Sequence, residues 1–237
     1  MTSVRGKFTA EGVTLARALG SLELDPSLRN PDTLAPQFLR PLFRLSLLPV
    51  VRHLVRIGME AVLPGAPLFL LARTKSLDAY VLGELTQTPR PEQLVILGAG
   101  LDSRPYRMRE ALDGVRVFEV DLPATAEWKQ ARLRENQTPR EHVTFVGIDF
   151  AHEALDAKLA EAGFRTNVRT VFLWEGVTYY LPESAVRATL AVLGQSAPGS
   201  SLAFDFLLED ALLHPDAHRG ARIMVDGLKH STEPFLF

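Results

Sequence analysis

Short apolar runs recur along the second half of the chain and predict the strands of a parallel β-sheet. They cover residues 94–97, 115–120, 143–147, 170–174 and 201–206. Residues 94–97 are four consecutive apolar residues, which is typical of a central strand buried on both faces. The pattern therefore predicts an α/β fold with an open parallel sheet and helices on both of its faces.

The first of these strands runs directly into a glycine turn. Residues 94–97 are followed by Gly98 and Gly100, which allow backbone angles and a close approach that a Cβ atom would block. We expect a helix after the turn, with its free N–H groups facing a ligand. A glycine turn after a strand also fits a purely structural role. The residue at the end of the next strand helps to distinguish this role from cofactor binding.

The second apolar run ends at Asp121, 21 residues after Gly100. A carboxylate at this place in a βαβ unit can accept hydrogen bonds from both hydroxyls of a cofactor ribose. Dinucleotide dehydrogenases share this device but carry a third glycine, and that position is Ser103 here. The pattern thus favours a cofactor without a pyrophosphate, such as S-adenosylmethionine.

Two further strands also end in carboxylates. Asp149 follows residues 143–147, and Glu175 follows residues 170–174. Ligands of open parallel sheets bind beyond the carboxyl ends of the strands, so these residues are predicted to converge with Asp121 on one crevice. The alternative for each is a solvated loop acid or a helix cap, and Asp149 can cap a helix that starts near residue 151.

The first part of the chain has a helical pattern from residue 8 to about residue 58, punctuated by prolines. Arg40 with Arg44, and Arg52 with Arg56, lie four residues apart and are predicted to share a helix face. A solvated face over an ordinary core explains them, and a helix on a membrane surface or an acidic partner is the alternative. We expect a helical cap over residues 1–90 and an S-adenosylmethionine-binding α/β domain over residues 91–237.

Charge and composition limit the classes of function. The net charge of −2 gives no general affinity for nucleic acid, and the absence of cysteine excludes disulfides and thiolate chemistry. Residues 1–90 carry 11 Lys and Arg against 7 Asp and Glu, and the remainder carries 15 against 21. This asymmetry suits a basic cap over an acidic crevice.

Targeting and metal signals are weak. The N-terminus lacks the apolar core of a signal peptide, and no apolar run approaches the roughly 18 residues that span a bilayer. We therefore expect a cytoplasmic protein that is not in a membrane. His214 and His218 are spaced for metal ligation on a helix, but Pro215 and the lack of a third ligand argue against it, so no metal site is expected.

Several longer strings resemble the leucine carboxyl methyltransferase family. They are LARTKSLDAYV (71–81), VILGAGLDSRPYRM (95–108), FEVDLPATAEWKQARL (118–133) and WEGVTYYLPESAV (174–186), together with TAEGVTLARAL and DPSLRNPDTLAPQFL near the N-terminus. Within the family, the chain is most similar to bacterial S-adenosylmethionine-dependent O-methyltransferases associated with polyketide biosynthesis. The resemblance covers most of residues 9–237.

The resemblance implies a class I methyltransferase fold with S-adenosylmethionine as cofactor. It also implies roles for six residues: Arg73 on the cofactor carboxylate, Gly98 and Gly100 as the floor of the site, Asp121 on the ribose, Asp149 by the adenine and Glu175 by the methionine end. The chemistry agrees, because the cofactor presents a carboxylate, which suits a guanidinium, and an ammonium and hydroxyls, which suit carboxylates. Without the resemblance, Arg73 reads as an ordinary arginine on a helix surface.

The acceptor is predicted to be the carboxylate or hydroxyl of a small molecule such as a polyketide. A carboxyl group is already ionised at neutral pH, so its methylation asks only for alignment and loss of water. Tyr179 is the candidate for orienting the acceptor oxygen, and packing is its alternative role. Methylation of a protein C-terminal carboxylate, a dinucleotide-dependent oxidoreductase and a non-catalytic binding protein remain as other hypotheses.

The end of the chain predicts an incomplete sheet. Proteins of this resemblance continue with two more strands, whereas residues 201–206 are followed here by a helical stretch near residues 210–228. We expect five parallel strands, with backbone groups of the fifth unpaired on its outer side. The chain then either is cut short or pairs this edge with a second copy of itself as a homodimer.

Overall fold

The computed structural model describes residues 6–150, 152–217 and 222 of the 237-residue chain. These residues fall into two compact units. The first runs up to Ser76 and resumes at Leu207, and the second extends from Leu77 to Phe206. The division falls inside helix α5 (Ala66–Leu85), before the boundary near residue 90 that the sequence led us to expect.

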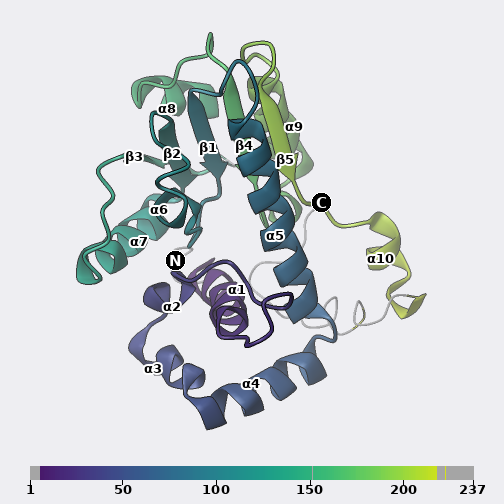
Figure 1. The fold of residues 1–237 in the computed structure, drawn as a ribbon. Helices are drawn as coiled ribbons and strands as arrows, with labels where there is room; N and C mark the ends of the chain where they lie inside the picture. The colour runs from purple at the N-terminus through teal and green to yellow at the C-terminus, as the bar shows by residue number, and fades with distance from the viewer. Residues whose placement is uncertain (1–5, 151, 218–221, 223–237) are drawn as a thin grey trace. The chain divides into compact units, whose positions relative to one another are not determined.

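The second unit contains a five-stranded, all-parallel sheet. Its strands are β1 (Gln93–Leu97), β2 (Arg116–Asp121), β3 (Val143–Gly147), β4 (Thr170–Trp174) and β5 (Ser201–Phe204). The order across the sheet is β3-β2-β1-β4-β5, as Figure 1 shows. The predicted strands are confirmed, and only the last is shorter, because it ends at Phe204 rather than at residue 206. The chain reverses direction across the sheet between β1 and β4, which is where ligands bind in folds of this kind.

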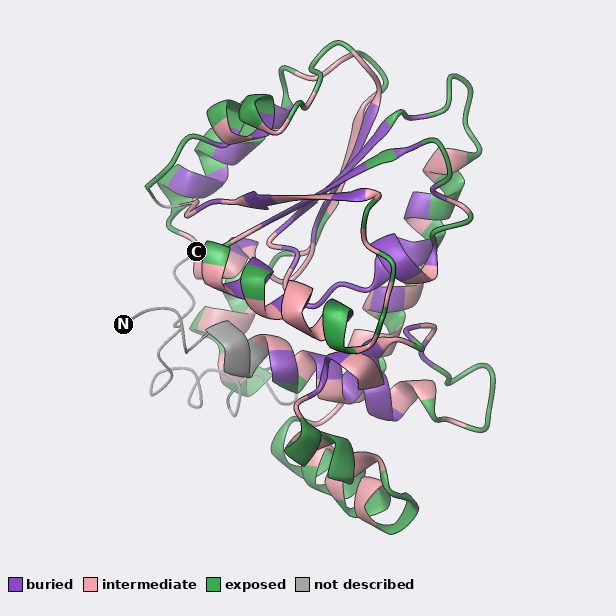
Figure 2. Cartoon of the chain, turned by 90° about the vertical axis from the view of Figure 1, so that its left-hand side faces the viewer, coloured by how far each residue is buried: buried purple, intermediate pink, exposed green. Residues whose placement is uncertain are grey.

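One face of the sheet packs against α8 (Leu155–Glu161) and α9 (Glu183–Leu193). The cluster on this face joins alternate residues of the strands, such as Val95 and Phe118, with Leu159 of α8 and Val186 of α9. Figure 2 shows that the strands are buried along most of their length. This apolar layer is the main core of the unit.

The opposite face packs against α7 (Pro123–Glu135). Glu119 lies between Phe118 and Val120 on β2, so its side chain points to the other face of the sheet. There it accepts a hydrogen bond of 2.7 Å from Lys129 of α7, with both side chains almost fully buried. Helices thus cover both faces, which confirms the predicted α/β architecture.

Strand β5 lies at the edge of the sheet and pairs only with β4 among the described residues. It is followed by α10 (Glu209–Leu213) and a short 3-10 helix, η4 (Pro215–Ala217). No sixth or seventh strand occurs in the described part of the chain. The predicted helical stretch near residues 210–228 continues beyond residue 217 into residues that, apart from 222, lie outside the description.

The first unit is helical, as predicted. Its described helices are α1 (Gly6–Ser21), α2 (Ala35–Phe38), α3 (Pro41–Arg44), the 3-10 helix η2 (Leu45–Leu47), α4 (Pro49–Val62) and the first part of α5, together with α10 and η4 near the end of the chain. Two buried carboxylates tie α1 to the segment that follows it: Glu11 pairs with Arg40 at 2.5 Å, and Asp32 pairs with Arg17 at 3.1 Å. These pairs fix the path of the chain around a small core of Ala18, Ala35 and Leu39.

Of the two arginine pairs that were predicted to share a helix face, the structure confirms only one. Arg40 precedes α3 with extended backbone, and its guanidinium binds Glu11, so Arg40 does not share a solvated helix face with Arg44. Pro41 at the first position of α3 sets this boundary, because proline suits a helix start. Arg52 and Arg56 do lie on one helix, α4.

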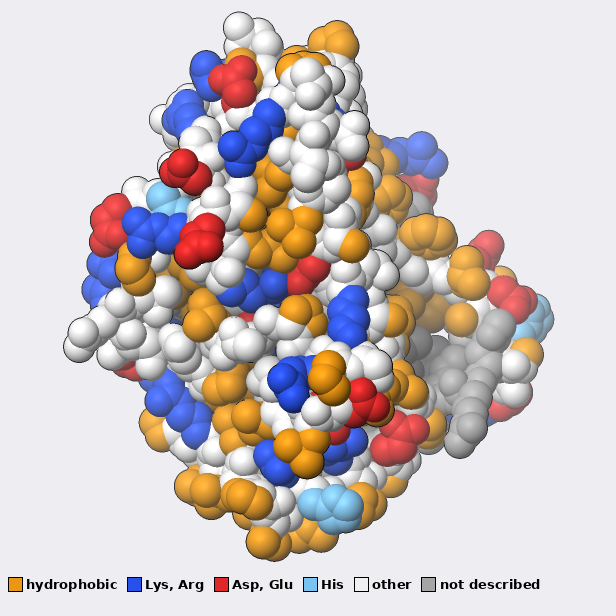
Figure 3. All heavy atoms as spheres, viewed as in Figure 1, with side chains coloured by type: hydrophobic (Ala, Val, Ile, Leu, Met, Phe, Trp, Pro, Cys, Tyr) orange, Lys and Arg blue, Asp and Glu red, His pale blue; other side chains and the backbone are white. Residues whose placement is uncertain are grey.

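Helix α4 has no fully buried residue, and several of its apolar side chains are exposed. They include Val50, Leu54 and Ile57, and Figure 3 shows hydrophobic side chains gathered at the bottom of the view, where α4 lies. None of the described helices is by itself long and apolar enough to cross a membrane; α4 and α5 meet that length and composition test only when joined across a bend of 97°.

Candidate functional site

The turn after β1 requires glycine at two positions. Gly98 has φ +62°, and a Cβ atom there would lie 2.3 Å from Cγ2 of Val177. Gly100 has φ +43°, which side chains rarely adopt, although the space around it is open. The Val177 side chain therefore packs directly over Gly98, and the open space of the turn lies at Gly100.

Asp121 at the end of β2 holds this turn. One carboxylate oxygen accepts the backbone N–H of Gly100 at 2.6 Å, and the other accepts the N–H of Leu122 at 2.6 Å. Burial raises the pKa of Asp121, while the two backbone N–H groups lower it in part. Each oxygen of a carboxylate can accept two hydrogen bonds, so the group can also accept from a ligand hydroxyl.

The expected helix N-terminus is not available as a binding device, so that prediction is wrong. Helix α6 (Arg104–Arg107) has only four residues. The backbone N–H of Arg104 donates to the carboxylate of Asp102 at 2.7 Å, and the next free N–H groups donate to the carbonyl of Ser103. A short helix whose first donors are used internally has little to offer an anion.

A buried arginine takes the place of that device. Arg104 is only 1% exposed and makes three ion pairs: with Asp78 at 2.8 Å, Asp102 at 2.5 Å and Glu175 at 2.7 Å. Burial lowers the pKa of this guanidinium, but the three carboxylates outweigh burial and raise it well above its ordinary value. Arg104 is therefore a permanent cation that fixes Glu175 at the end of β4.

The cluster joins two guanidinium groups to three carboxylates. Arg107 also donates to Asp78, at 2.5 Å, so Arg104 and Arg107 share this carboxylate. Nη2 of Arg104 is buried and has no hydrogen-bond partner among the described residues. Carboxylates that are held in place in this way can also receive a cationic ligand.

Asp205, directly after β5, was missed by the sequence analysis. Its carboxylate accepts the N–H of Gly176 at 2.6 Å, and its carbonyl accepts the Thr178 hydroxyl at 2.8 Å. These bonds hold the loop that carries Val177 over Gly98. The rule that identified Asp121 and Glu175, a carboxylate at a strand end, also identifies Asp205, and Asp102 and Arg104 lie inside the string used for the family resemblance.

The structure separates Asp149 from this network. β3, which precedes it, lies at the far edge of the sheet, two strands away from β1. The Asp149 side chain is 47% exposed and lies 3.1 Å from His152. It does not cap a helix near residue 151, because α8 begins at Leu155. Its expected role by an adenine ring stays a prediction.

Tyr179 lies in the 3-10 helix η3 (Thr178–Tyr180), on the loop after β4. Its ring is half-buried and packs against that of Tyr180, with ring centroids 4.8 Å apart. This contact agrees with the packing alternative, and the orienting role stays a prediction.

Arg73 belongs to the first unit and lies on α5. Its guanidinium carbon lies 5.4 Å from the centroid of the Phe69 ring. The other predicted cofactor-binding residues belong to the second unit, so the contact of Arg73 with a cofactor carboxylate stays a prediction. Among the described residues, no group of three His, Cys, Asp or Glu is arranged to hold a metal ion, and His218 lies outside them.

Comparison of the sequence with models of known protein families identifies the family of this chain. The profile described as leucine carboxyl methyltransferase matches residues 10–194. The chain belongs to the leucine carboxyl methyltransferase family. The match includes the glycine turn, Asp121, Arg104 and Glu175, whereas Asp205 lies beyond the matched residues.

Relatives in sequence agree. A protein of Streptomyces coelicolor is 40% identical over 136 residues, covering 56% of this chain and 46% of the relative. A protein of Mycolicibacterium gilvum is 32% identical over 216 residues, covering 86% of this chain and 68% of the relative. Both names begin "Putative S-adenosyl-L-methionine-dependent methyltransferase". The chain spans about half the length of the first of these relatives.

The fold also has a solved counterpart. A crystal structure of a DUF574 family protein from Streptomyces avermitilis matches with a TM-score of 0.58 and 14% identity, covering 94% of this chain and 77% of that one. At this identity the similarity concerns the fold alone. It agrees with the parallel sheet and helical N-terminal segment described above.

Proposed function

We propose that this chain binds S-adenosyl-L-methionine and takes part in methyl transfer. The observation that carries the proposal is the carboxylate-rich cluster around Arg104, next to a glycine turn held by Asp121. Family membership supports it, since the relatives are named for this cofactor.

The residues present fit the cofactor. The carboxylates of the cluster complement an ammonium or sulfonium cation, and Glu175 is held in place to accept from the ammonium. Asp121 has the capacity to accept from ribose hydroxyls beside Gly100, where the space is open. When bound, the cofactor supplies an electrophilic methyl group on its sulfonium.

The chain's own groups bind and orient. Arg104 holds Glu175 in place through a charge-assisted hydrogen bond of 2.7 Å to its carboxylate. Asp205 fixes the loop that carries Val177 over the turn. Preorganised charge of this kind lowers the free energy needed to align reactants.

For the acceptor we propose an oxygen of a small molecule, either a carboxylate or a hydroxyl, such as that of a polyketide. A carboxylate is ionised at neutral pH and needs no base, which fits a site where no catalytic base has been identified. The resemblance to O-methyltransferases of polyketide biosynthesis supports this choice, and a protein C-terminal carboxylate is the alternative acceptor.

Calorimetric titration tests the cofactor. We expect S-adenosylmethionine and S-adenosylhomocysteine to bind, with NAD binding far more weakly because Ser103 replaces the third glycine of a dinucleotide site. Micromolar binding of NAD together with no binding of S-adenosylmethionine would contradict the proposal.

The variant Asp121→Ala locates the site. Hydrogen bonds to a charged group contribute about 1.5–3 kcal/mol each, so loss of those to the ribose should weaken cofactor binding by at least about tenfold. Asp113→Ala is the control, since Asp113 lies exposed on the loop before β2. Wild-type affinity in a folded Asp121→Ala protein would show that the ribose lies elsewhere.

A further inference from the structure

A cavity of about 350 Å³ lies within the first unit, between the end of α1 and helix α4. Its apolar wall includes Leu19, Leu22, Leu24 and Pro49. Pockets for small ligands commonly start at about 300 Å³ and combine an apolar lining with a few polar groups. This cavity is formed by α1, the segment directly after it and α4, and it shares no residue with the cluster around Arg104.

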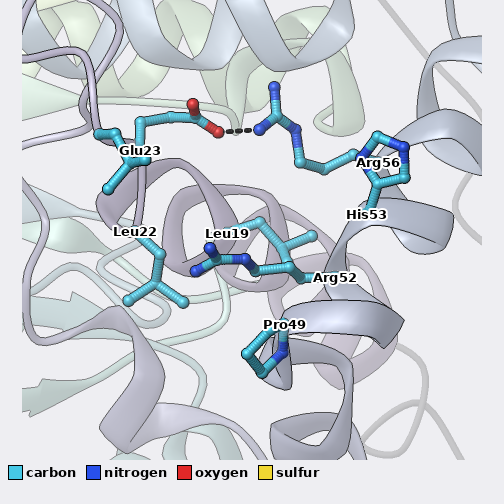
Figure 4. A pocket seen from close by; sticks show the side chains of 8 residues that line it. Leu19, Leu22, Glu23, Pro49, Arg52, His53 and Arg56 are labelled. Carbon is cyan, nitrogen blue, oxygen red and sulfur yellow. Dashed lines mark hydrogen bonds and ion pairs between the residues drawn. The ribbon is translucent and has the colours of Figure 1, made fainter.

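Arg52 supplies the first polar group of this cavity. Figure 4 shows its side chain extending from α4 between Leu19 and Leu22. Its guanidinium makes no hydrogen bond or ion pair with any residue that the structure describes. A half-buried guanidinium among leucines has lost part of its hydration, and a bound anion would replace it.

The second arginine of the cavity is already neutralised. Arg56 forms an ion pair with Glu23, which also lines the cavity, and Figure 4 shows the two side chains facing each other. The formal charge left over by Arg52, Arg56 and Glu23 is a single positive charge. The cavity is therefore matched to a monoanion.

We propose that this cavity is a binding site for an amphipathic monocarboxylate. The carboxylate pairs with the planar fork of Arg52, which can donate two parallel hydrogen bonds to it. The apolar body of the ligand lies against the leucine wall. A phosphate dianion fits less well, because it would bring more negative charge than Arg52 balances and would leave the leucines without an apolar partner.

Calorimetric titration of the full chain, without cofactor, tests the site with octanoate as the probe. We expect octanoate to bind, and octanamide, which has the same length but no charge, to bind at least about tenfold more weakly. Inorganic phosphate should also bind more weakly than octanoate. Equal binding of octanamide, stronger binding of phosphate, or no binding of octanoate at millimolar concentration overturns the proposal.

Two variants locate the binding to this cavity. Arg52→Gln removes the charge from a side chain that holds no other residue, so the protein should fold normally and bind octanoate at least about tenfold more weakly. Leu24→Asp places a carboxylate on the exposed rim and should weaken binding by repulsion. Arg187→Gln, which affects an exposed arginine on α9, should leave octanoate binding unchanged. Wild-type affinity in either cavity variant overturns the proposal, whatever the outcome of the cofactor titrations.

Discussion

At the scale of single residues, the carboxylates at the strand ends serve the fold and the proposed site at once. Asp121 holds the N–H of Gly100, and Glu175 receives a hydrogen bond from Arg104. A ligand that binds them meets groups whose positions are already fixed. A substitution at Asp121 or Glu175 can therefore weaken both ligand binding and the fold. Its effect on binding can be measured separately only when the new side chain keeps the same shape.

Glu175→Gln satisfies that condition. Glutamine keeps an oxygen that can accept from Arg104, while the negative charge of the side chain disappears. We expect S-adenosylmethionine affinity to fall by about tenfold through loss of a charge-assisted hydrogen bond, while the melting temperature changes little. Glu183→Gln, at an exposed site on α9, is the control for charge alone. Equal affinities of the two variants would remove Glu175 from the binding site.

Gly98→Ala tests the turn itself. The new Cβ atom would meet Val177 at 2.3 Å, and φ is +62°, so the substitution combines overlap with backbone strain. Unfolding in denaturant should show a loss of about 2–4 kcal/mol. Gly58→Ala in α4 is the matched control, because nothing lies within 4 Å of its Cβ position, and it should gain about 0.5–1 kcal/mol. A neutral Gly98→Ala would mean that the loop carrying Val177 moves aside without cost.

At the scale of elements, strand β5 is the least protected part of the sheet. It has four residues, none of them fully buried, and Phe204 and Phe206 are exposed on and beyond it. An edge with unpaired backbone groups and apolar side chains readily pairs with another chain. The homodimer proposed from the sequence would use this edge.

Phe204→Lys should reduce such self-association, because a lysine on an edge strand disfavours pairing with another chain. We expect sedimentation velocity to show a concentration-dependent dimer for the wild-type chain and a monomer for the variant. Val50→Lys, on the exposed face of α4, controls for loss of surface hydrophobicity elsewhere. A dimer that persists in Phe204→Lys but disappears in Val50→Lys would assign the interface to α4.

At the scale of the whole molecule, a buried ion pair couples the stability of the fold to pH. Burial raises the pKa of Glu119 to about 7, against the lowering effect of Lys129. The folded state therefore binds a proton more readily than the unfolded chain, whose carboxyl titrates near 4.5. The contribution of Glu119 to the free energy of unfolding is therefore fully present below pH 4.5 and is lost as the pH rises to about 7.

The raised pKa of Glu119 predicts that the protein becomes less stable as the pH rises from 4.5 to 7. Between pH 4.5 and 7, the Glu119 contribution to the unfolding free energy of the wild-type protein should fall by about 3 kcal/mol. The double variant Glu119→Gln, Lys129→Met should lack this component, which denaturant titrations at several pH values can measure. Glu183→Gln with Arg187→Met, an exposed pair on α9, should keep the wild-type dependence. A parallel dependence in both double variants would show that Glu119 titrates normally.

The sequence by itself determined the sheet. Strands at the centre of a parallel sheet are mostly apolar, so β1 and β4 could be located from residues 94–97 and 170–174 alone. The strand-end position of Asp121 and Glu175 follows from the same local pattern. The family resemblance also depends on short contiguous strings, and the family match confirms it.

Only the tertiary structure decided how these residues are connected. Arg104 meets Asp78 across 26 positions and Glu175 across 71, and no local pattern encodes such pairs. The same holds for Val177 above Gly98 and for Asp205 at the N–H of Gly176. The helix expected after the glycine turn is present, but its N-terminus does not face a ligand: its first N–H donates to Asp102, and the Arg104 side chain pairs with carboxylates from distant segments. The pattern of apolar residues indicates which residues become buried when the chain folds. The partner of a buried charge is decided only when distant segments pack together.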